Sequence, residues 1–182
     1  EGKEDLLASI PEIKKIIEGF DFTVVECDGF EADDIIGAIA QQAEKEGYVV
    51  FMVTTDKDFG QLVSDKIKIY KPGYQGGKVE IMGKKEVCEK WGIKSVSQVI
   101  DILGLMGDAA DNIPGIAGVG EKTAAKLLAH SESVDNILAD AEHIEGGLGE
   151  PIRPGKGMAV LRKKLAPQRT TGTFHFHDDE FR

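Results

Sequence analysis

The sequence predicts an α/β fold in which a parallel sheet with flanking helices is followed by an all-helical part. Strand and helix patterns alternate between residues 22 and 70, the run at residues 48–53 is almost entirely apolar, and every periodic segment after Lys84 is helical. We therefore expect two parts, an α/β core over residues 1–83 and a helical part over residues 84–182. Because both parts are small, we expect them to share an interface.

The α/β part begins with a helical pattern. Isoleucines at positions 10, 13, 16 and 17 predict a helix with Pro11 in its first turn and an end at Gly19. Strands are then expected at residues 22–26, 48–53 and 67–70, helices at 31–46 and 58–63, and a small hairpin closing at 79–81. Strand–helix–strand order favours parallel pairing.

The second part carries only helical patterns. Helices are expected near residues 84–91, 95–106, 120–130, 133–140 and 156–165. A glycine-rich connection at about 112–130 separates two of them and predicts a helix-hairpin-helix.

Composition and charge exclude some functions. A net charge of −10, from 22 Lys and Arg against 32 Asp and Glu, argues against a protein held to nucleic acid by overall positive charge. No apolar run approaches the roughly 18 to 20 residues of a membrane span. The two cysteines, Cys27 and Cys88, form no C-x-x-C pair, which favours a reduced, cytoplasmic setting. The chain starts without Met, so we expect a fragment, and nothing implies an oligomer.

Three acidic groups are candidates for catalysis. They are Glu31, Asp33 and Asp34; Asp56 and Asp58; and Asp108 and Asp111. Taken alone, the first is also typical of an acidic first helical turn, the second of an Asx turn with Asp58 capping the next helix, and the third of a polar loop before Pro114.

Together the three groups favour a metal site. Two of them lie where a strand leads into a helix, and such junctions meet at one edge of a sheet. Seven neighbouring carboxylates repel one another unless cations relieve the repulsion, and oxygen ligands suit Mg²⁺ or Mn²⁺. Two such ions about 4 Å apart are a known device for phosphodiester hydrolysis.

The glycine-rich connection predicts a second function. Gly115, Gly118 and Gly120 precede a helix that opens with Lys122 and Thr123. Glycines permit close backbone approach, and free N–H groups at a helix N-terminus bind phosphate, so we expect sequence-independent contacts to a DNA backbone. An ordinary tight helix–helix turn is the alternative. Six basic and no acidic residues between Arg153 and Arg169 also favour a polyanion over the alternative of a solvated helix face.

The motifs FEADD, TTDKD and LMGDAADNIPGIAGVGEKTAAKLL, in this order, resemble the 5′ nuclease domain of bacterial DNA polymerase I, a member of the flap-endonuclease family. The resemblance covers about residues 5–165. It implies a PIN-like sheet, a helix-three-turn-helix element and Mg²⁺-dependent cleavage of 5′ flaps, nicked duplexes and 5′ ends in DNA replication and repair. It also implies a polymerase after the nuclease in the intact bacterial protein.

The same resemblance assigns roles by position. It places Glu31, Asp33, Asp34 and Asp56 nearer the first metal ion and Asp58, Asp108 and Asp111 nearer the second. It implies that the hairpin glycines grip the duplex and that their backbone carbonyls hold a monovalent cation, K⁺.

Departures from the family leave alternatives open. Thr55 stands where the family has Gly, and residues 146–157 and the tail after Leu165 fit poorly. The family's first strand, with its metal-binding Asp, and its helical arch are absent, so we expect the fragment to cleave poorly. A non-catalytic DNA-binding module is the main alternative, followed by a PIN-type RNase and a Mg²⁺ phosphatase.

Overall fold

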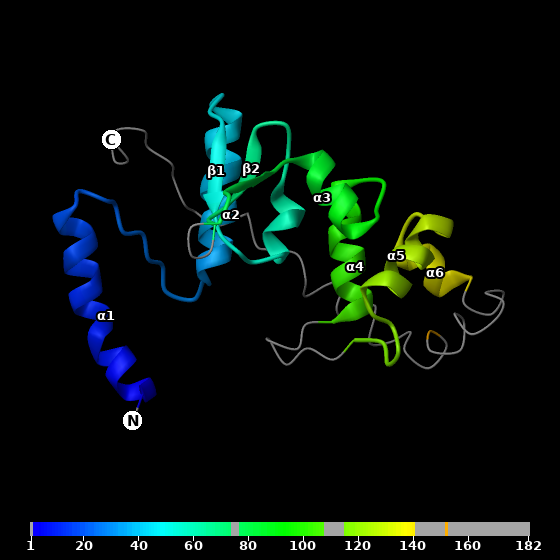
Figure 1. Cartoon of the computed structure of the whole chain (residues 1–182), viewed down its shortest axis with the longest axis horizontal. Helices are drawn as coiled ribbons and strands as arrows, with labels where there is room; N and C mark the ends of the chain where they lie inside the picture. Colours follow the sequence, from blue (N-terminus) through cyan, green and yellow to red (C-terminus); the bar gives the residue numbers. More distant parts are fainter. Residues whose placement is uncertain (1, 74–76, 108–114, 141–151, 153–182) are drawn as a thin grey trace.

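The computed structural model describes residues 2–73, 77–107, 115–140 and 152 and confirms the α/β class (Figure 1). Its elements are α1 (Gly2–Gly19), α2 (Ala32–Lys45), β1 (Val50–Val53), the 3₁₀ helix η1 (Asp58–Leu62), β2 (Ile67–Lys71), β3 (Glu80–Met82), α3 (Lys84–Trp91), the 3₁₀ helix η3 (Val96–Gln98), α4 (Val99–Met106), α5 (Glu121–His130) and α6 (Val134–Ala139). The helix expected at 156–165 lies outside these residues. Among the helices described, none combines the length and the apolar character that crossing a membrane requires.

The sheet has three strands in the order β1-β2-β3. β1 and β2 are parallel, with Val50 opposite Ile67 and Val53 opposite Tyr70. β3 runs antiparallel to β2, with Ile69 opposite Met82. The predicted parallel pairing is therefore confirmed for β1 and β2, whereas the predicted small hairpin makes the sheet mixed.

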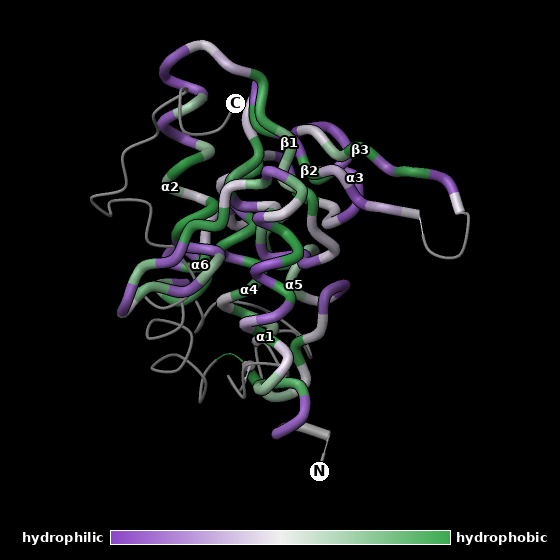
Figure 2. The backbone as a smooth tube through the Cα atoms, turned by 90° about the vertical axis from the view of Figure 1, so that its left-hand side faces the viewer, coloured by the Kyte–Doolittle hydropathy of each residue, from purple (hydrophilic) through white to green (hydrophobic). Residues whose placement is uncertain are grey.

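One hydrophobic core joins the sheet to the helical part. It runs without a break from Met52 on β1 through Trp91 on α3 to Ile137 on α6. Ile102 and Leu105 on α4 are fully buried at its centre. In Figure 2 the hydrophobic stretches gather between α2, the strands and α4, and further ones run along α1. The two predicted parts therefore share an interface and pack as one body around α4.

Two predictions for the first thirty residues are wrong: the position of Pro11 in the first helix and the strand at residues 22–26. α1 begins at Gly2, so Pro11 lies inside the helix and not in its first turn. The apolar stripe of this helix starts at Leu6, earlier than Ile10. The acidic side chains of Glu4 and Asp5 lie in its first turn, where the positive end of the helix dipole stabilises them. Figure 1 shows α1 standing apart from the sheet.

The strand expected at residues 22–26 is also absent. The segment has strong β propensity, but the described sheet ends at β1 and pairs with no part of it. Phe22 is 67% exposed. A strand is stable only when its backbone groups find a ladder partner, which sequence propensity alone does not supply.

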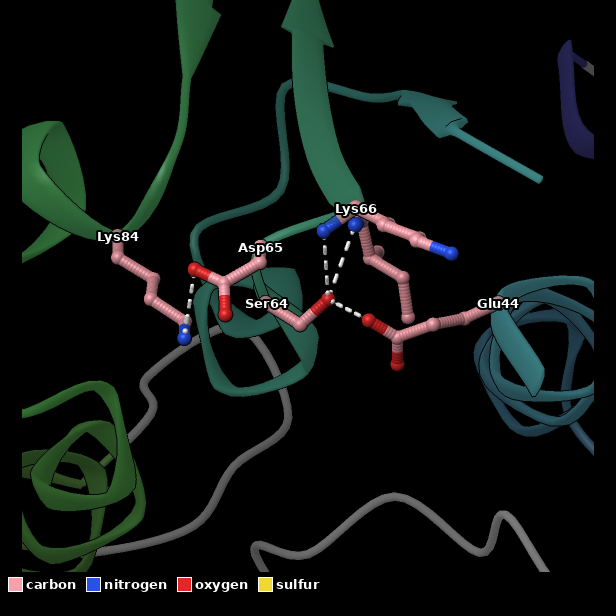
Figure 3. A network of polar contacts seen from close by, with 6 residues as sticks. Glu44, Ser64, Asp65, Lys66 and Lys84 are labelled. Carbon is pink, nitrogen blue, oxygen red and sulfur yellow. Dashed lines mark hydrogen bonds and ion pairs between the residues drawn. The ribbon is translucent and has the colours of Figure 1, made fainter. Parts of the chain in front are cut away.

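A polar network fixes the far end of α2 to the start of β2 (Figure 3). The Ser64 hydroxyl donates to the Glu44 carboxylate and accepts hydrogen bonds from the backbone N–H groups of Lys66 (3.2 Å) and Ile67 (2.9 Å). Beside it, Lys84 Nζ lies 2.9 Å from Asp65 Oδ1. These contacts hold α2 against the sheet at the end opposite the acidic motifs.

Candidate active site and nucleic-acid interface

The start of α2 and the end of β1 lie at the same end of the sheet. α2 packs against β1 and β2, and only residues 46–49 connect it to β1. Helix and strand must therefore run in opposite directions. This arrangement brings residues 31–34 and 54–58 to one end of the α/β part, as expected for a ligand site beyond the carboxyl ends of parallel strands.

The first acidic motif forms the opening turn of α2. Glu31 is the N-cap residue, in an extended conformation, and its side chain makes no capping hydrogen bond. Asp34 N donates to Asp33 Oδ1 at 3.0 Å. Glu31 is exposed, whereas Asp33 and Asp34 are half-buried. The motif therefore does form an acidic first turn, as the alternative interpretation predicted. In this turn the Glu31 carboxylate is exposed to solvent at the positive end of the helix dipole.

The second acidic motif is a tight turn between β1 and η1. Asp56 N donates to Thr54 Oγ1 at 3.0 Å, and Asp58 N donates to Asp56 Oδ1 at 2.9 Å. Thr54 N donates to Tyr70 O at 3.2 Å, which anchors the turn to β2. The predicted Asx turn is present, but its acceptor is Asp56 and not Asp58, because the turn forms two residues before the 3₁₀ helix starts.

The two aspartates of this turn differ in exposure. Asp56 is exposed at the end of the sheet, whereas Asp58 is half-buried and its Oδ1 atom is out of contact with solvent. The Asp58 carboxylate is therefore partly shielded from solvent, whereas Asp56 is open to it.

The described acids are of the ligand type that binds Mg²⁺ or Mn²⁺, but they do not form a metal site by themselves. All are carboxylates, the ligand type that Mg²⁺ and Mn²⁺ prefer. Within residues 2–73, 77–107, 115–140 and 152, no three acidic, His or Cys side chains are close enough to hold a metal ion. Asp108 and Asp111 lie outside the described residues. Convergence of all seven acids therefore stays a prediction.

An open pocket lies beside the second acidic motif. Its empty space, including the solvent-filled mouth, is about 280 Å³, and its walls come from the β1–η1 turn, β2, β3 and α3. The lining includes Asp56 and three lysines, Lys57, Lys71 and Lys90, together with Trp91. These lysines are not among the site residues predicted from the sequence. For Lys71 and Lys90 a usable signal was the excess of lysine over residues 66–94.

Helix α3, which carries three residues of this pocket, is fixed at its start by a capping interaction. Gly83 N donates to Glu86 Oε2 at 2.9 Å. Hydrogen bonds from the backbone N–H groups of Glu86 and Gly83 hold the pKa of the Glu86 carboxyl below its ordinary value. The carboxylate is therefore the form that this cap uses.

The glycine hairpin is held in place by its apolar residues. Ile116 and Val119 are buried, and Ile116 N donates to Leu105 O at 2.9 Å. Val119 N donates to Ile116 O at 2.9 Å and closes a turn whose third residue, Gly118, has a φ of 81°. This left-handed conformation requires glycine. The hairpin expected at 112–130 is confirmed from residue 115 onward.

The outer side of the hairpin is open to a partner. A Cβ atom built on Gly118 or Gly120 would meet no atom within 4 Å. Gly120 is the N-cap of α5, and its carbonyl accepts from Thr123 N (3.0 Å) and Ala124 N (2.9 Å). The N–H groups of Glu121 and Lys122 lie in the first turn and have no carbonyl within the helix to bond, and the Lys122 side chain is exposed. An anion can therefore approach backbone and ammonium donors together.

A buried glutamine, which the sequence analysis missed, connects the start of α4 to α5 and α6. Gln98 Oε1 accepts from Lys94 N at 2.8 Å, and Gln98 Nε2 donates to Glu132 O at 2.8 Å. Lys94 Nζ also donates to Ala129 O at 3.2 Å. The capping-box spacing of Ser95 and Gln98 could have predicted the local hydrogen bonds at the start of α4, but not the contact to Glu132.

Two family models match the chain. Residues 1–92 match a 5′-3′ exonuclease N-terminal resolvase-like domain, and residues 94–182 match a 5′-3′ exonuclease C-terminal SAM fold. The DNA polymerase I proteins of Bacillus caldotenax and Bacillus subtilis are each 40% identical to the chain, over 91% and 89% of its length. The chain spans only about a fifth of these relatives, 19% and 18%.

Solved structures support the same fold. The T5 D15 protein co-crystallised with metal ions superposes with a TM-score of 0.78 at 21% identity, over 93% of this chain and 64% of its own. The catalytic core of Rad2 in complex with DNA substrate gives a TM-score of 0.61 at 18% identity, over 92% of this chain and 58% of its own. From the family-model matches and the polymerase relatives, we conclude that the chain belongs to the 5′-3′ exonuclease family.

Proposed function

We propose that the chain is the nuclease fragment of a bacterial, cytoplasmic 5′-3′ exonuclease and flap endonuclease that hydrolyses DNA phosphodiesters by two-metal catalysis. The observation that carries this proposal is the placement of the two acidic turns, residues 31–34 and 54–58, at the same end of the sheet. The names of the curated relatives support a DNA substrate, and the T5 and Rad2 structures were obtained with metal ions and with DNA.

The acids divide into two sets under this proposal. Glu31, Asp33, Asp34 and Asp56 would hold one divalent ion, and Asp58, Asp108 and Asp111 the other. Bound Mg²⁺ or Mn²⁺ supplies electrostatic stabilisation to the attacking and leaving oxygens of the phosphodiester. The chain's own contribution is to hold carboxylates in position through the Thr54–Asp56–Asp58 turn and the first turn of α2.

The hairpin would position the substrate. Its open glycine side and the first turn of α5 offer N–H donors and Lys122 to successive phosphates of a duplex. Contacts to the sugar–phosphate backbone carry no sequence information, so we expect binding to 5′ flaps or nicked duplexes by shape. K⁺ held by the hairpin carbonyls belongs to the same proposal.

A DNA-binding module without catalysis is the second candidate. It is favoured by the contrast between a hairpin whose described part, from residue 115 onward, is held by backbone hydrogen bonds and a described acidic end in which no three ligands meet. The two candidates agree on DNA and differ on hydrolysis.

Cleavage of a labelled 5′-flap duplex tests the proposal. The intact protein and this chain are assayed side by side, with Mg²⁺ and with a chelator, and an RNA flap serves as a second substrate. We expect Mg²⁺-dependent cleavage by the intact protein and little or none by this chain, which still binds the duplex. Absence of cleavage by the intact protein would establish the binding module, and preference for the RNA flap would establish an RNase.

A further inference from the structure

We propose that the pocket between the β1–η1 turn, the end of β2 and α3 is a second phosphate-binding site, in which Lys71 and Lys90 hold the cleaved DNA strand next to its reacting phosphate. The proposal rests on the proposed nuclease function and adds to it a site on the sheet side of the molecule, apart from the hairpin. We call it the lysine pocket, defined by Lys57, Lys71, Lys90 and Trp91.

The charge of this region differs from that of the chain as a whole. Residues 66–94, which run from β2 to the end of α3, contain eight lysines and three glutamates, in a chain whose net charge is −10. A strongly acidic protein repels DNA at long range, so its contacts must come from local basic surfaces. The lysine pocket is such a surface within the described residues.

Lys71 and Lys90, the two lysines on which the proposal rests, remain available to a ligand. Lys71 Nζ lies 3.7 Å from Glu80 Oε2, and both side chains are substantially exposed, so their pairing is weak. Lys90 Nζ lies 5.8 Å from the centre of the Trp91 ring, with the ring forming a buried wall behind it. A phosphate can therefore bind these ammonium groups without breaking a strong ion pair.

The position of the pocket indicates which phosphate it takes. Asp56 lines its edge, and the Asp56 Oδ1 atom is already occupied by the N–H of Asp58. The Thr54 hydroxyl accepts from Asp56 N, which leaves its own proton to donate. If the reacting phosphate of a DNA strand lies at Asp56 and Asp58, the next phosphate of that strand lies beside the Thr54 hydroxyl and the lysine ammonium groups. An acidic site for metal ions and a basic site for the neighbouring phosphate then share one wall.

A salt titration of duplex binding tests the pocket. The chain, its Lys71→Ala/Lys90→Ala variant and a charge-matched Lys15→Ala/Lys45→Ala control are titrated with a labelled 5′-flap duplex over a range of KCl. Lys15 and Lys45 are exposed and far from the pocket in sequence and fold. We expect the log–log salt slope to fall by about 1.8 in the pocket variant, about 0.9 per lost phosphate contact, and not in the control. Lys71→Arg/Lys90→Arg restores the slope.

Trp91 provides a second measurement, because it is the one tryptophan of the chain. We expect a saturable change in its emission when the flap duplex binds or when inorganic phosphate replaces chloride at constant ionic strength. The change disappears in Lys71→Ala/Lys90→Ala and persists in the control variant.

The outcomes separate this proposal from the one on which it rests. If all variants bind with equal slopes, or if the duplex binds without changing Trp91 emission, the lysine pocket is not a phosphate site while the nuclease function stands. If the intact protein fails to cleave, the nuclease function falls, and a persisting loss of slope would still support phosphate binding. If the wild-type chain binds no duplex, the pocket proposal falls with the binding that it requires.

Discussion

The glycine hairpin at residues 115–122 is anchored by buried apolar side chains, whereas the acidic turns at residues 31–34 and 54–58 are held mainly by hydrogen bonds within each turn and by one backbone bond to β2. Ile116 and Val119 anchor the hairpin in the core, and Leu105 accepts a hydrogen bond from it. The acidic turns fix their backbones through Thr54, Asp56 and Asp33, but within the described residues no three ligands meet. Backbone recognition can be built from one continuous segment, whereas the two-metal site proposed here needs ligands from three separate segments of the chain.

The surroundings of the two regions show the same contrast. The helices that carry the hairpin are sealed in the core, with Ile102 fully buried. In the α/β part, Val53 of β1 is 68% exposed and the apolar residues of α1 are exposed as well. Among the described residues, the large apolar side chains of the helical part are buried or half-buried, whereas several of those in the α/β part are exposed.

The largest effect is expected at the acidic end. Asp58→Ala in the intact protein should reduce flap cleavage by about 1000-fold or more, since bound metal supplies several kcal/mol and each factor of ten in rate corresponds to about 1.4 kcal/mol. Asp111→Ala should do the same. DNA binding should persist, because removing negative charge near DNA does not weaken it. Cleavage and binding are measured on the same flap duplex, and an unchanged rate at saturating Mg²⁺ would remove Asp58 from the site.

A matched pair of core substitutions sharpens the difference in packing. Ile102→Ala should lower the free energy of unfolding by about 2–5 kcal/mol, because Ile102 is 0% exposed and its loss leaves a cavity. Ile13→Ala on α1 should change it by less than about 0.5 kcal/mol, because Ile13 is 46% exposed. Urea unfolding followed by circular dichroism measures both. Equal losses would mean that α1 is packed in solution.

These two regions also show what sequence alone can predict. The turn after β1 was predictable because an apolar β-branched run ends at Val53 and polar residues follow. The hairpin was predictable because its glycines mark positions that need an unusual φ or close approach. Both depend on residues that are near each other in the chain.

The features that the sequence did not predict depend on distant partners. Residues 22–26 have the composition of a strand, yet a strand requires a neighbour that composition does not name. The Gln98 contact to Glu132 spans 34 residues. The lysine pocket combines three elements, so only the fold reveals it.

Two glycine substitutions distinguish the backbone strain of the hairpin from the access of DNA to its surface. Gly118→Ala should lower the free energy of unfolding by about 1–2 kcal/mol, because its φ of 81° strains any side chain, and it should weaken duplex binding as well. Gly120→Ala should weaken binding with little loss of stability, because its φ of −94° is ordinary and a Cβ there would meet only open space. Thermal melts and anisotropy titrations distinguish the two. Unchanged duplex affinity in both variants would exclude the hairpin as the contact.

The smallest expected effect is a difference in the rate of thiol modification between the two cysteines. Cys27 is exposed in the segment between α1 and α2, whereas Cys88 is half-buried on α3, where burial raises the pKa of its thiol. The thiolate is the reactive form, so at a given pH Cys88 has less of it as well as less access to reagent. A disulfide reagent near neutral pH should therefore modify Cys27 first, and raising the pH should increase the rate at Cys88 over a range above that of an ordinary thiol. Cys27→Ser and Cys88→Ser assign the two phases. If Cys88 reacted as fast as Cys27, α3 would open as readily as the exposed segment, and the contrast between a sealed core and an open N-terminal region would not hold in solution.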